Sequence, residues 1–91
     1  MIDTPTLPPP AIEQPAPHQV SYGLVTGRAA RGTYRVIVSA NGRRLASEPL
    51  RGRRFSLCVS LPTGDISVQV TTVARGGRRS FRVIEGVFGL P

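Results

Sequence analysis

Apolar residues alternate with polar ones along two neighbouring runs, residues 53–61 and 65–73. The alternating apolar positions are Phe55, Leu57, Val59 and Leu61 in the first run, and Ile66, Val68 and Val70 in the second. Because successive side chains of a strand point to opposite faces, each run has one apolar and one polar face. Pro62 and Gly64 between the runs favour a reversal. The pattern predicts a hairpin whose apolar face needs a second sheet to cover it.

Four further segments alternate in the same way, and they are expected to supply the sheet that covers this apolar face. Residues 19–26 form the first expected strand, in which Gly23 allows a bend. Residues 33–40 form a strong strand, residues 43–48 a short edge strand that Pro49 ends, and residues 79–85 the sixth strand. Residues 86–91 are expected to add a short last strand or to lead into a following domain.

Turn signals separate these strands at intervals typical of a β-sandwich. Asn41-Gly42 is the strongest, because both central residues of a type I′ turn need positive φ. No ten-residue stretch has helical periodicity. The sequence thus predicts an all-β, antiparallel β-sandwich of six to seven strands. Its expected interior consists of Tyr34, Val36, Val38, Phe55, Leu57, Val59, Ile66, Val68, Val70, Phe81 and Val83.

Most of the nine prolines lie before Gln19. Proline fixes φ and removes amide donors, so residues 1–18 are expected to be a disordered or extended tether. The predicted organisation is a linker over residues 1–18, a sandwich over 19–85, and a last strand or linker over 86–91.

The strands carry a resemblance to a known family. Gly23-x-Val25-x-Gly27, Val36-x-Val38-x-x-Asn41-Gly42 and Phe55-Ser56-x-x-Val59-x-Leu61-Pro62-x-Gly64 resemble bacterial immunoglobulin-like modules, such as the glucodextranase B-type domain. The resemblance implies that the predicted sandwich is immunoglobulin-like, and that the chain is an accessory module without catalytic residues. Residues 85–91 also look like the junction before β-lactamase-like serine hydrolase domains, which implies a hydrolase as the neighbour.

The chain is strongly basic. It has a net charge of +7, and all twelve basic residues are arginines. Such a charge permits anionic partners: wall polymers that carry phosphate, anionic lipid surfaces or nucleic acid. Nucleic acid is disfavoured, because Phe55 and Phe81 are expected inside, and only Tyr22 or Tyr34 is left for base stacking.

Eight of the arginines are predicted to gather at one end. In an antiparallel sandwich the connections alternate between the two ends, so the first, third and fifth loops share one end. Arginine forks suit phosphate and carboxylate groups. The candidate anion-binding residues are Arg28, Arg31, Arg51, Arg53, Arg54, Arg75, Arg78 and Arg79, with Arg43 and Arg44 at the opposite end. The alternative is that these arginines bind no ligand and only keep solvent-exposed turns soluble.

The sequence offers no catalytic, cofactor or metal site. The only histidine, His18, falls in the predicted tether, and the carboxylates are scattered. Cys58 has no second cysteine for an intramolecular disulfide. Its parity places it with Ser56 and Ser60 on the polar face, where an inert thiol is favoured over a redox thiol assisted by Arg54.

The cellular location is inferred from two kinds of targeting segment that are not found in the sequence. No apolar run suits a transmembrane helix, and residues 1–18 lack a signal-peptide pattern. The chain is expected to be a piece of a longer exported protein, hence extracellular or in the cell envelope; if it is complete, it is cytoplasmic.

Three functions follow as hypotheses. The first is a non-catalytic spacer module that positions a neighbouring domain. The second is a small basic protein that docks on anionic polymers or surfaces through its arginines. The third is a module that adds a partner strand to the edge formed by residues 43–48.

Overall fold

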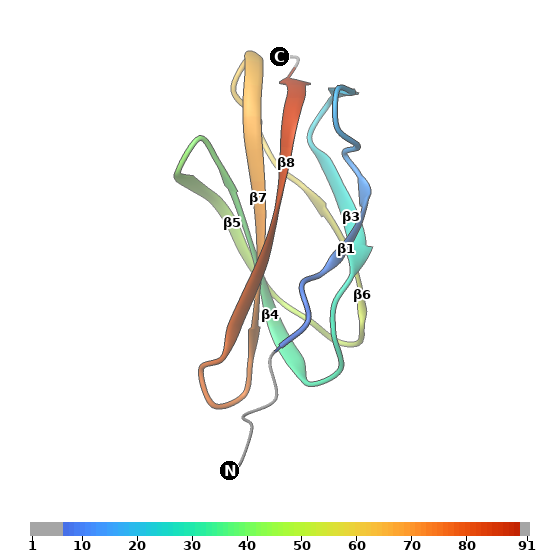
Figure 1. Ribbon diagram of the computed structural model, residues 1–91, viewed down its shortest axis with the longest axis vertical. Coiled ribbons are helices and arrows are strands. Elements are labelled where there is room, and N and C mark those ends of the chain that lie inside the picture. Colours follow the sequence, from blue (N-terminus) through green and yellow to red (C-terminus); the bar gives the residue numbers. More distant parts are fainter. Residues whose placement is uncertain (1–6, 90–91) are drawn as a thin grey trace.

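The computed structural model describes residues 7–89, which form eight strands in two facing sheets (Figure 1). The strands are β1 (Ala11–Gln14), β2 (Val20–Ser21), β3 (Leu24–Arg28), β4 (Thr33–Ala40), β5 (Arg43–Pro49), β6 (Arg54–Cys58), β7 (Gly64–Ala74) and β8 (Arg79–Gly89). One sheet has the order β1-β3-β6 and the other β2-β8-β7-β4-β5. Neighbours are antiparallel except β2 and β8, which are parallel. The all-β, immunoglobulin-like sandwich is confirmed, with eight strands where six to seven were expected.

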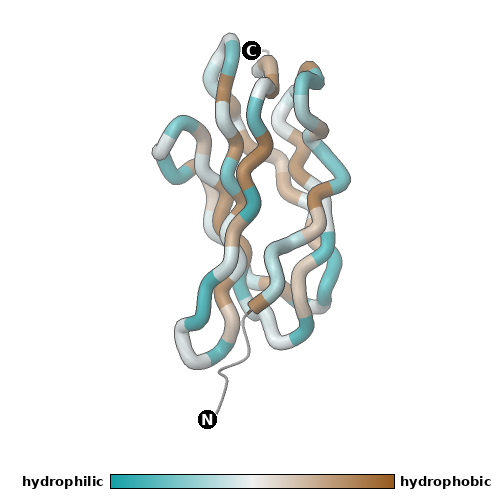
Figure 2. Tube along the Cα trace, in the orientation of Figure 1, coloured by the Kyte–Doolittle hydropathy of each residue, from teal (hydrophilic) through white to brown (hydrophobic). Residues whose placement is uncertain are grey.

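The core lies between the two sheets. Alternate residues of the strands turn inward, and Figure 2 shows the resulting alternation of brown and paler segments along them. The buried cluster comprises Val25, Ala29, Val36, Val38, Ala40, Phe55, Leu61, Ile66, Val68, Val70, Ile84 and Val87, with Leu57 and Val59 partly buried beside it. Most of the predicted interior is therefore correct.

The predicted hairpin of residues 53–73 is wrong. β6 pairs with β3 in the three-stranded sheet, whereas β7 lies in the five-stranded sheet. The segment between them crosses from one layer to the other, and Leu61 is buried on the way. The two alternating apolar faces cover each other across the core, which satisfies the same pattern as a hairpin would.

The Pro-rich segment differs from the expected tether. β1 pairs with β3, and Pro10 and Pro15 are among the fully buried residues. The Nε atom of Arg82 donates a hydrogen bond of 2.8 Å to the Pro10 carbonyl. The segment is extended, as proline requires, but it forms the edge of a sheet, where missing amide donors cost little. Residues 1–6 of the predicted tether lie outside the described residues.

The last strand has the opposite orientation to the predicted one. Phe81 and Val83, expected inside, are 58% and 38% exposed, whereas Ile84 and Val87 are buried. An irregular register places both of these inward residues against β7. Had Phe81 and Val83 pointed inward, strict alternation would also have turned the Glu85 carboxylate towards the core, at a large desolvation cost.

Tyr34, also expected inside, is 44% exposed because the β4–β7 pairing is irregular between Thr33 and Arg35. Two other predictions at this sheet are confirmed. Asn41 and Gly42 have φ of 50° and 83°, as the type I′ turn demands. β5 is an edge strand. Residues 86–89 continue β8 and form no separate last strand.

Candidate anion-binding site

Three loops meet at the lower end of the sandwich in Figure 1: those between β3 and β4, between β5 and β6, and between β7 and β8. They are the first, third and fifth loops of the sequence prediction. All eight candidate arginines lie in or beside these loops, and each is exposed. We call this region the arginine-rich end; it comprises Arg28, Arg31, Arg51, Arg53, Arg54, Arg75, Arg78 and Arg79.

Local turn chemistry holds two of these loops in shape. The Thr33 amide donates to the Ala30 carbonyl at 3.3 Å, and Gly32 has φ of 90°. The β7–β8 loop repeats the arrangement: the Gly77 amide donates to the Ala74 carbonyl at 3.1 Å. Glycine suits the third position of such a turn, where φ is positive. Each turn therefore presents an arginine at its second position.

Hydrogen bonds fasten the β3–β4 loop to the β5–β6 loop. The Ala29 amide donates to the Arg53 carbonyl at 2.6 Å, and the Nε atom of Arg53 donates to the Ala29 carbonyl at 3.3 Å. These bonds hold two arginine-bearing segments side by side, although more than twenty residues separate them in the sequence.

A groove of about 240 Å³ lies at this junction. Arg28, Arg31 and Arg53 line one part of it, and Pro8 and Pro9 line another part. The groove therefore combines three guanidinium groups with an apolar wall, and its walls can hold an anion against the backbone of the first loop. The sequence analysis did not predict that Pro8 and Pro9 line a groove, because it assigned them to the tether.

The eight arginines do not form one pocket. Arg51 and Arg54 line a separate depression of about 360 Å³ that also contains Glu48. Arg75, Arg78 and Arg79 lie at the β7–β8 turn, a different part of the same end. The shared end that the sequence predicted is therefore present, but it is divided into three groups.

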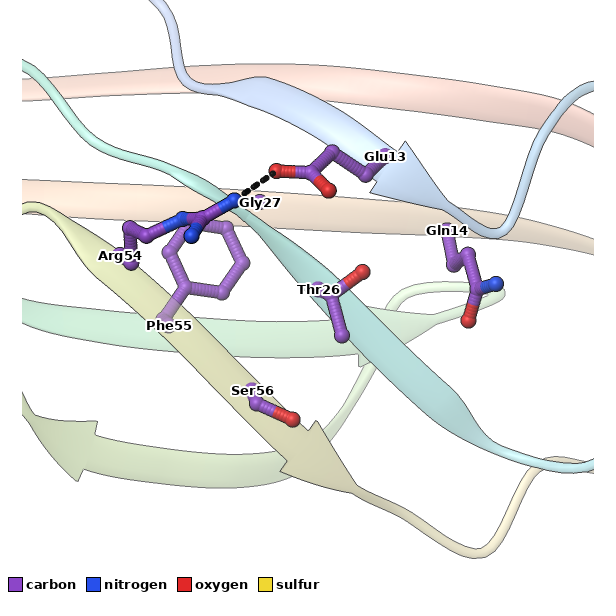
Figure 3. Close-up of a pocket in the computed structure, with 7 residues that line it drawn as sticks. All are labelled: Glu13, Gln14, Thr26, Gly27, Arg54, Phe55 and Ser56. Atoms are coloured by element: carbon purple, nitrogen blue, oxygen red, sulfur yellow. Dashed lines mark ion pairs between the residues drawn. The ribbon is translucent and has the colours of Figure 1, made fainter.

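A larger groove of about 630 Å³ runs over the three-stranded sheet between β1 and β6. Figure 3 shows Thr26 and Ser56 along it, with Glu13 facing Arg54 at its rim. The Arg54 Nη2 and Glu13 Oε1 atoms are 3.7 Å apart, and both side chains are mostly exposed. Water screens such a pair strongly, so its contribution to stability is small.

Two arginines outside the predicted set also have defined partners. Arg82 anchors the Pro10 carbonyl, and the Nη1 atom of Arg35 donates to Ser47 Oγ at 2.9 Å across β4 and β5. Their roles depend on pairing between distant segments, which the local pattern does not reveal.

The other two residues that the sequence analysis considered, Cys58 and His18, are both exposed. Cys58 is a free, exposed thiol, and Ser56 and Ser60 are exposed with it, as their parity predicted. His18 is exposed and lies against Gly86, since a Cβ atom there would be 2.7 Å from His18 Nδ1. Within residues 7–89, no group of three or more histidine, cysteine or carboxylate side chains is placed to hold a metal ion. That part of the chain also has no helix long and apolar enough to cross a membrane.

Comparison with known proteins supports the fold. No protein-family model matches the sequence, and no curated protein matches it. Among solved structures, the fibronectin(III)-like modules of Clostridium thermocellum CbhA are similar, with a TM-score of 0.63. That match covers 88% of this chain and 94% of the other, at 16% sequence identity. The chain is a small domain with an immunoglobulin-like, fibronectin(III)-like sandwich fold.

Proposed function

We propose that this domain is a non-catalytic accessory module of an exported bacterial envelope protein, and that it spaces and positions a neighbouring domain. The observation that carries the proposal is the course of the chain. The described residues begin near the arginine-rich end, and β8 finishes at the opposite end of a body that measures 48 × 26 × 20 Å (Figure 1). A rigid sandwich with this course holds whatever precedes it apart from whatever follows it.

The hydrogen-bonded β-sheets supply the stiffness that a flexible linker lacks. β7 and β8 are each eleven residues long and pair along most of their length, so they form a continuous ribbon down the long axis. The resemblance to glucodextranase B-type modules, and to the junction before β-lactamase-like hydrolases, favours an enzyme domain as the neighbour.

Replacement of the module in its parent protein tests this role. One variant lacks the module, one carries a Gly/Ser linker in its place, and one carries an unrelated fibronectin(III)-like module. We expect the neighbouring domain to lose activity on its immobilised substrate in the first two variants and to regain it in the third. Full activity with the flexible linker would contradict the proposal, as would a gene that encodes no other domain.

Docking on an anionic polymer is a second candidate function, favoured by the groove between Arg28, Arg31 and Arg53. A teichoic-type polymer or another polymer rich in phosphate is the expected class of ligand. Binding should weaken steeply as salt rises, because bound arginines release counterions. Arg28→Gln with Arg31→Gln should weaken it, whereas Arg43→Gln with Arg44→Gln, at the other end, should not. No binding at low salt would exclude this function and leave the spacer role intact.

A further inference from the structure

The outer face of the five-stranded sheet presents an exposed phenylalanine beside two arginines. Val73 on β7 pairs with Arg79 on one side and with Arg35 on the other, so the two arginines share one row across the sheet. Phe81 pairs with Thr71 in the next row and is 58% exposed. Since alternate residues of a strand share a face, Phe81 and Arg79 point to the same side.

Sheet geometry sets the spacing of these groups. Phe81 lies two residues from Arg79 along β8, about 7 Å, and β8 is separated from β4 by two inter-strand steps, about 10 Å. The phenyl ring thus has one cation beyond it along its own strand. The other cation, Arg35, starts two strands away, and its guanidinium extends further across the sheet to Ser47 Oγ on β5. A planar ligand on the ring and its anionic groups can meet both.

Charge on this face is uneven. Arg75 and Arg78 of the adjoining turn extend the basic area beyond Arg79. The carboxylates with outward parity on β7 and β8 are Asp65 and Glu85, which lie towards the opposite end of these strands. The basic half of the face therefore suits an anion and disfavours a second copy of the same surface.

Hydrogen-bonding side chains lie on one side of the ring, on strands β7, β4 and β5. Gln69 Nε2 donates to Thr71 Oγ1 at 3.2 Å, and one of the five N–H donors of Arg35 goes to Ser47. Amide, hydroxyl and guanidinium groups on this face of the sheet can contact the edges of a base that stacks on the ring.

We propose that this surface binds single-stranded nucleic acid, with a base stacked on Phe81 and phosphates held by Arg79 and Arg35. Proteins bind single-stranded nucleic acid with aromatic rings on a sheet, on which bases stack, and with nearby cations that contact the sugar-phosphate backbone. The prediction that disfavoured nucleic acid relied on a buried Phe81, and that premise is wrong. The proposal is independent of the spacer role and of the arginine groove.

Three probes distinguish recognition of a base from recognition of a phosphate chain. They are an oligothymidylate of about ten nucleotides, an abasic phosphodiester of the same length, and inorganic polyphosphate. We expect the oligothymidylate to bind the intact domain most tightly at low salt. With about two phosphates engaged, by Arg79 and Arg35, the slope of log K against log salt should be about −1.4. Equal binding of all three probes would overturn the proposal and favour the arginine groove, and no binding of oligothymidylate would also overturn it.

Phe81→Ala tests the ring. Loss of one stacked base should weaken oligothymidylate binding by about fivefold to a hundredfold and leave polyphosphate binding unchanged. Phe88→Ala is the matched control, because Phe88 is 41% exposed on the same strand, pairs with Asp65, and lies at the far end. Equal effects of the two variants, or no effect of Phe81→Ala, would overturn the proposal.

Phe81→Trp gives a direct reading that does not depend on a destabilising change. The chain contains no tryptophan, so the introduced indole would be the only one. Oligothymidylate should quench its fluorescence, and the abasic polymer should not. Unchanged fluorescence with saturating oligothymidylate would overturn the proposal. A dimer that Phe81→Ala dissociates, found by sedimentation without nucleic acid binding, would instead assign the face to self-association.

Discussion

The two sheets contribute unequally to the core. In the five-stranded sheet, the central pair β4 and β7 turns Val36, Val38, Val68 and Val70 inward, and each is fully buried. In the three-stranded sheet, Val25 is fully buried and Phe55 nearly so, but Leu57 on β6 is only partly covered. The five-stranded sheet therefore supplies most of the apolar burial that holds the sandwich together.

The three-stranded sheet depends on backbone contacts with the N-terminal segment. β1 forms one edge of this sheet by pairing with β3, and the Ala11 carbonyl lies close to Gly27. Arg82 of the other sheet holds Pro10 in place by a hydrogen bond to its carbonyl. Its integrity thus depends on close approach and on hydrogen bonds more than on apolar area. Four substitutions, from the largest expected effect to the smallest, test this difference.

Val70→Ala should cause the largest loss. It removes two methyl groups from a fully buried position in the five-stranded sheet, which lowers the free energy of unfolding by about 2.5 kcal/mol. Denaturant unfolding measures the loss. Val83→Ala is the control, since Val83 lies on the outer face of the adjacent strand and is 38% exposed. Equal losses would show that the five-stranded sheet has no privileged inner face.

Gly27→Ala should come next. A Cβ atom there would collide with the Ala11 carbonyl oxygen and lie 2.7 Å from Phe55 Cζ, so β1 must move. Overpacking of this kind costs about 2 kcal/mol. Hydrogen exchange at Ala11–Gln14 should accelerate together with the loss. Gly52→Ala, where a Cβ atom meets nothing within 4 Å, should leave both measurements unchanged.

Arg82→Gln should have a smaller effect. It removes the donor that reaches Pro10 and should lower the free energy of unfolding by about 1 kcal/mol. Faster proteolysis of the N-terminal segment should accompany this loss. Arg75→Gln, an exposed change in the β7–β8 turn, serves as the comparison; an equal response would mean that the Arg82 bond does not hold the segment.

Glu13→Gln should have the smallest effect, below about 0.5 kcal/mol, because both side chains of the 3.7 Å pair with Arg54 are mostly exposed. Unfolding at low and high salt checks this, since screening should remove even that difference. A loss comparable with that of Gly27→Ala would mean that β1 is held by charge and not by close packing.

The sequence was most informative where local rules suffice. Asn41-Gly42 predicted its turn because only positive φ fits there, and Ser56, Cys58 and Ser60 were placed outside by their parity alone. The loops of the arginine-rich end were also placed correctly, since alternation of connections needs only the number and order of the strands. The eight arginines in them were thereby located, but their division into three groups was not foreseen.

The errors lie where two local solutions compete. β8 has apolar residues on both faces, Phe81 and Val83 on one and Ile84 and Val87 on the other. Which face turned inward depended on an irregularity in its register with β7, and the exposure of Phe81 at the proposed nucleic-acid surface depends on the same choice. The Pro-rich segment likewise gained its place from partners far along the chain.

By itself the sequence determined an all-β domain, its turns and the end of the molecule that carries most of its arginines. Alternation and turn chemistry act between close neighbours, so they can be read one segment at a time. Only the tertiary structure decided that β6 pairs with β3 and not with β7, that β1 joins the sheet, and that Phe81 faces outward. These outcomes depend on which distant strands pair, and long-range pairing is a property of the whole chain.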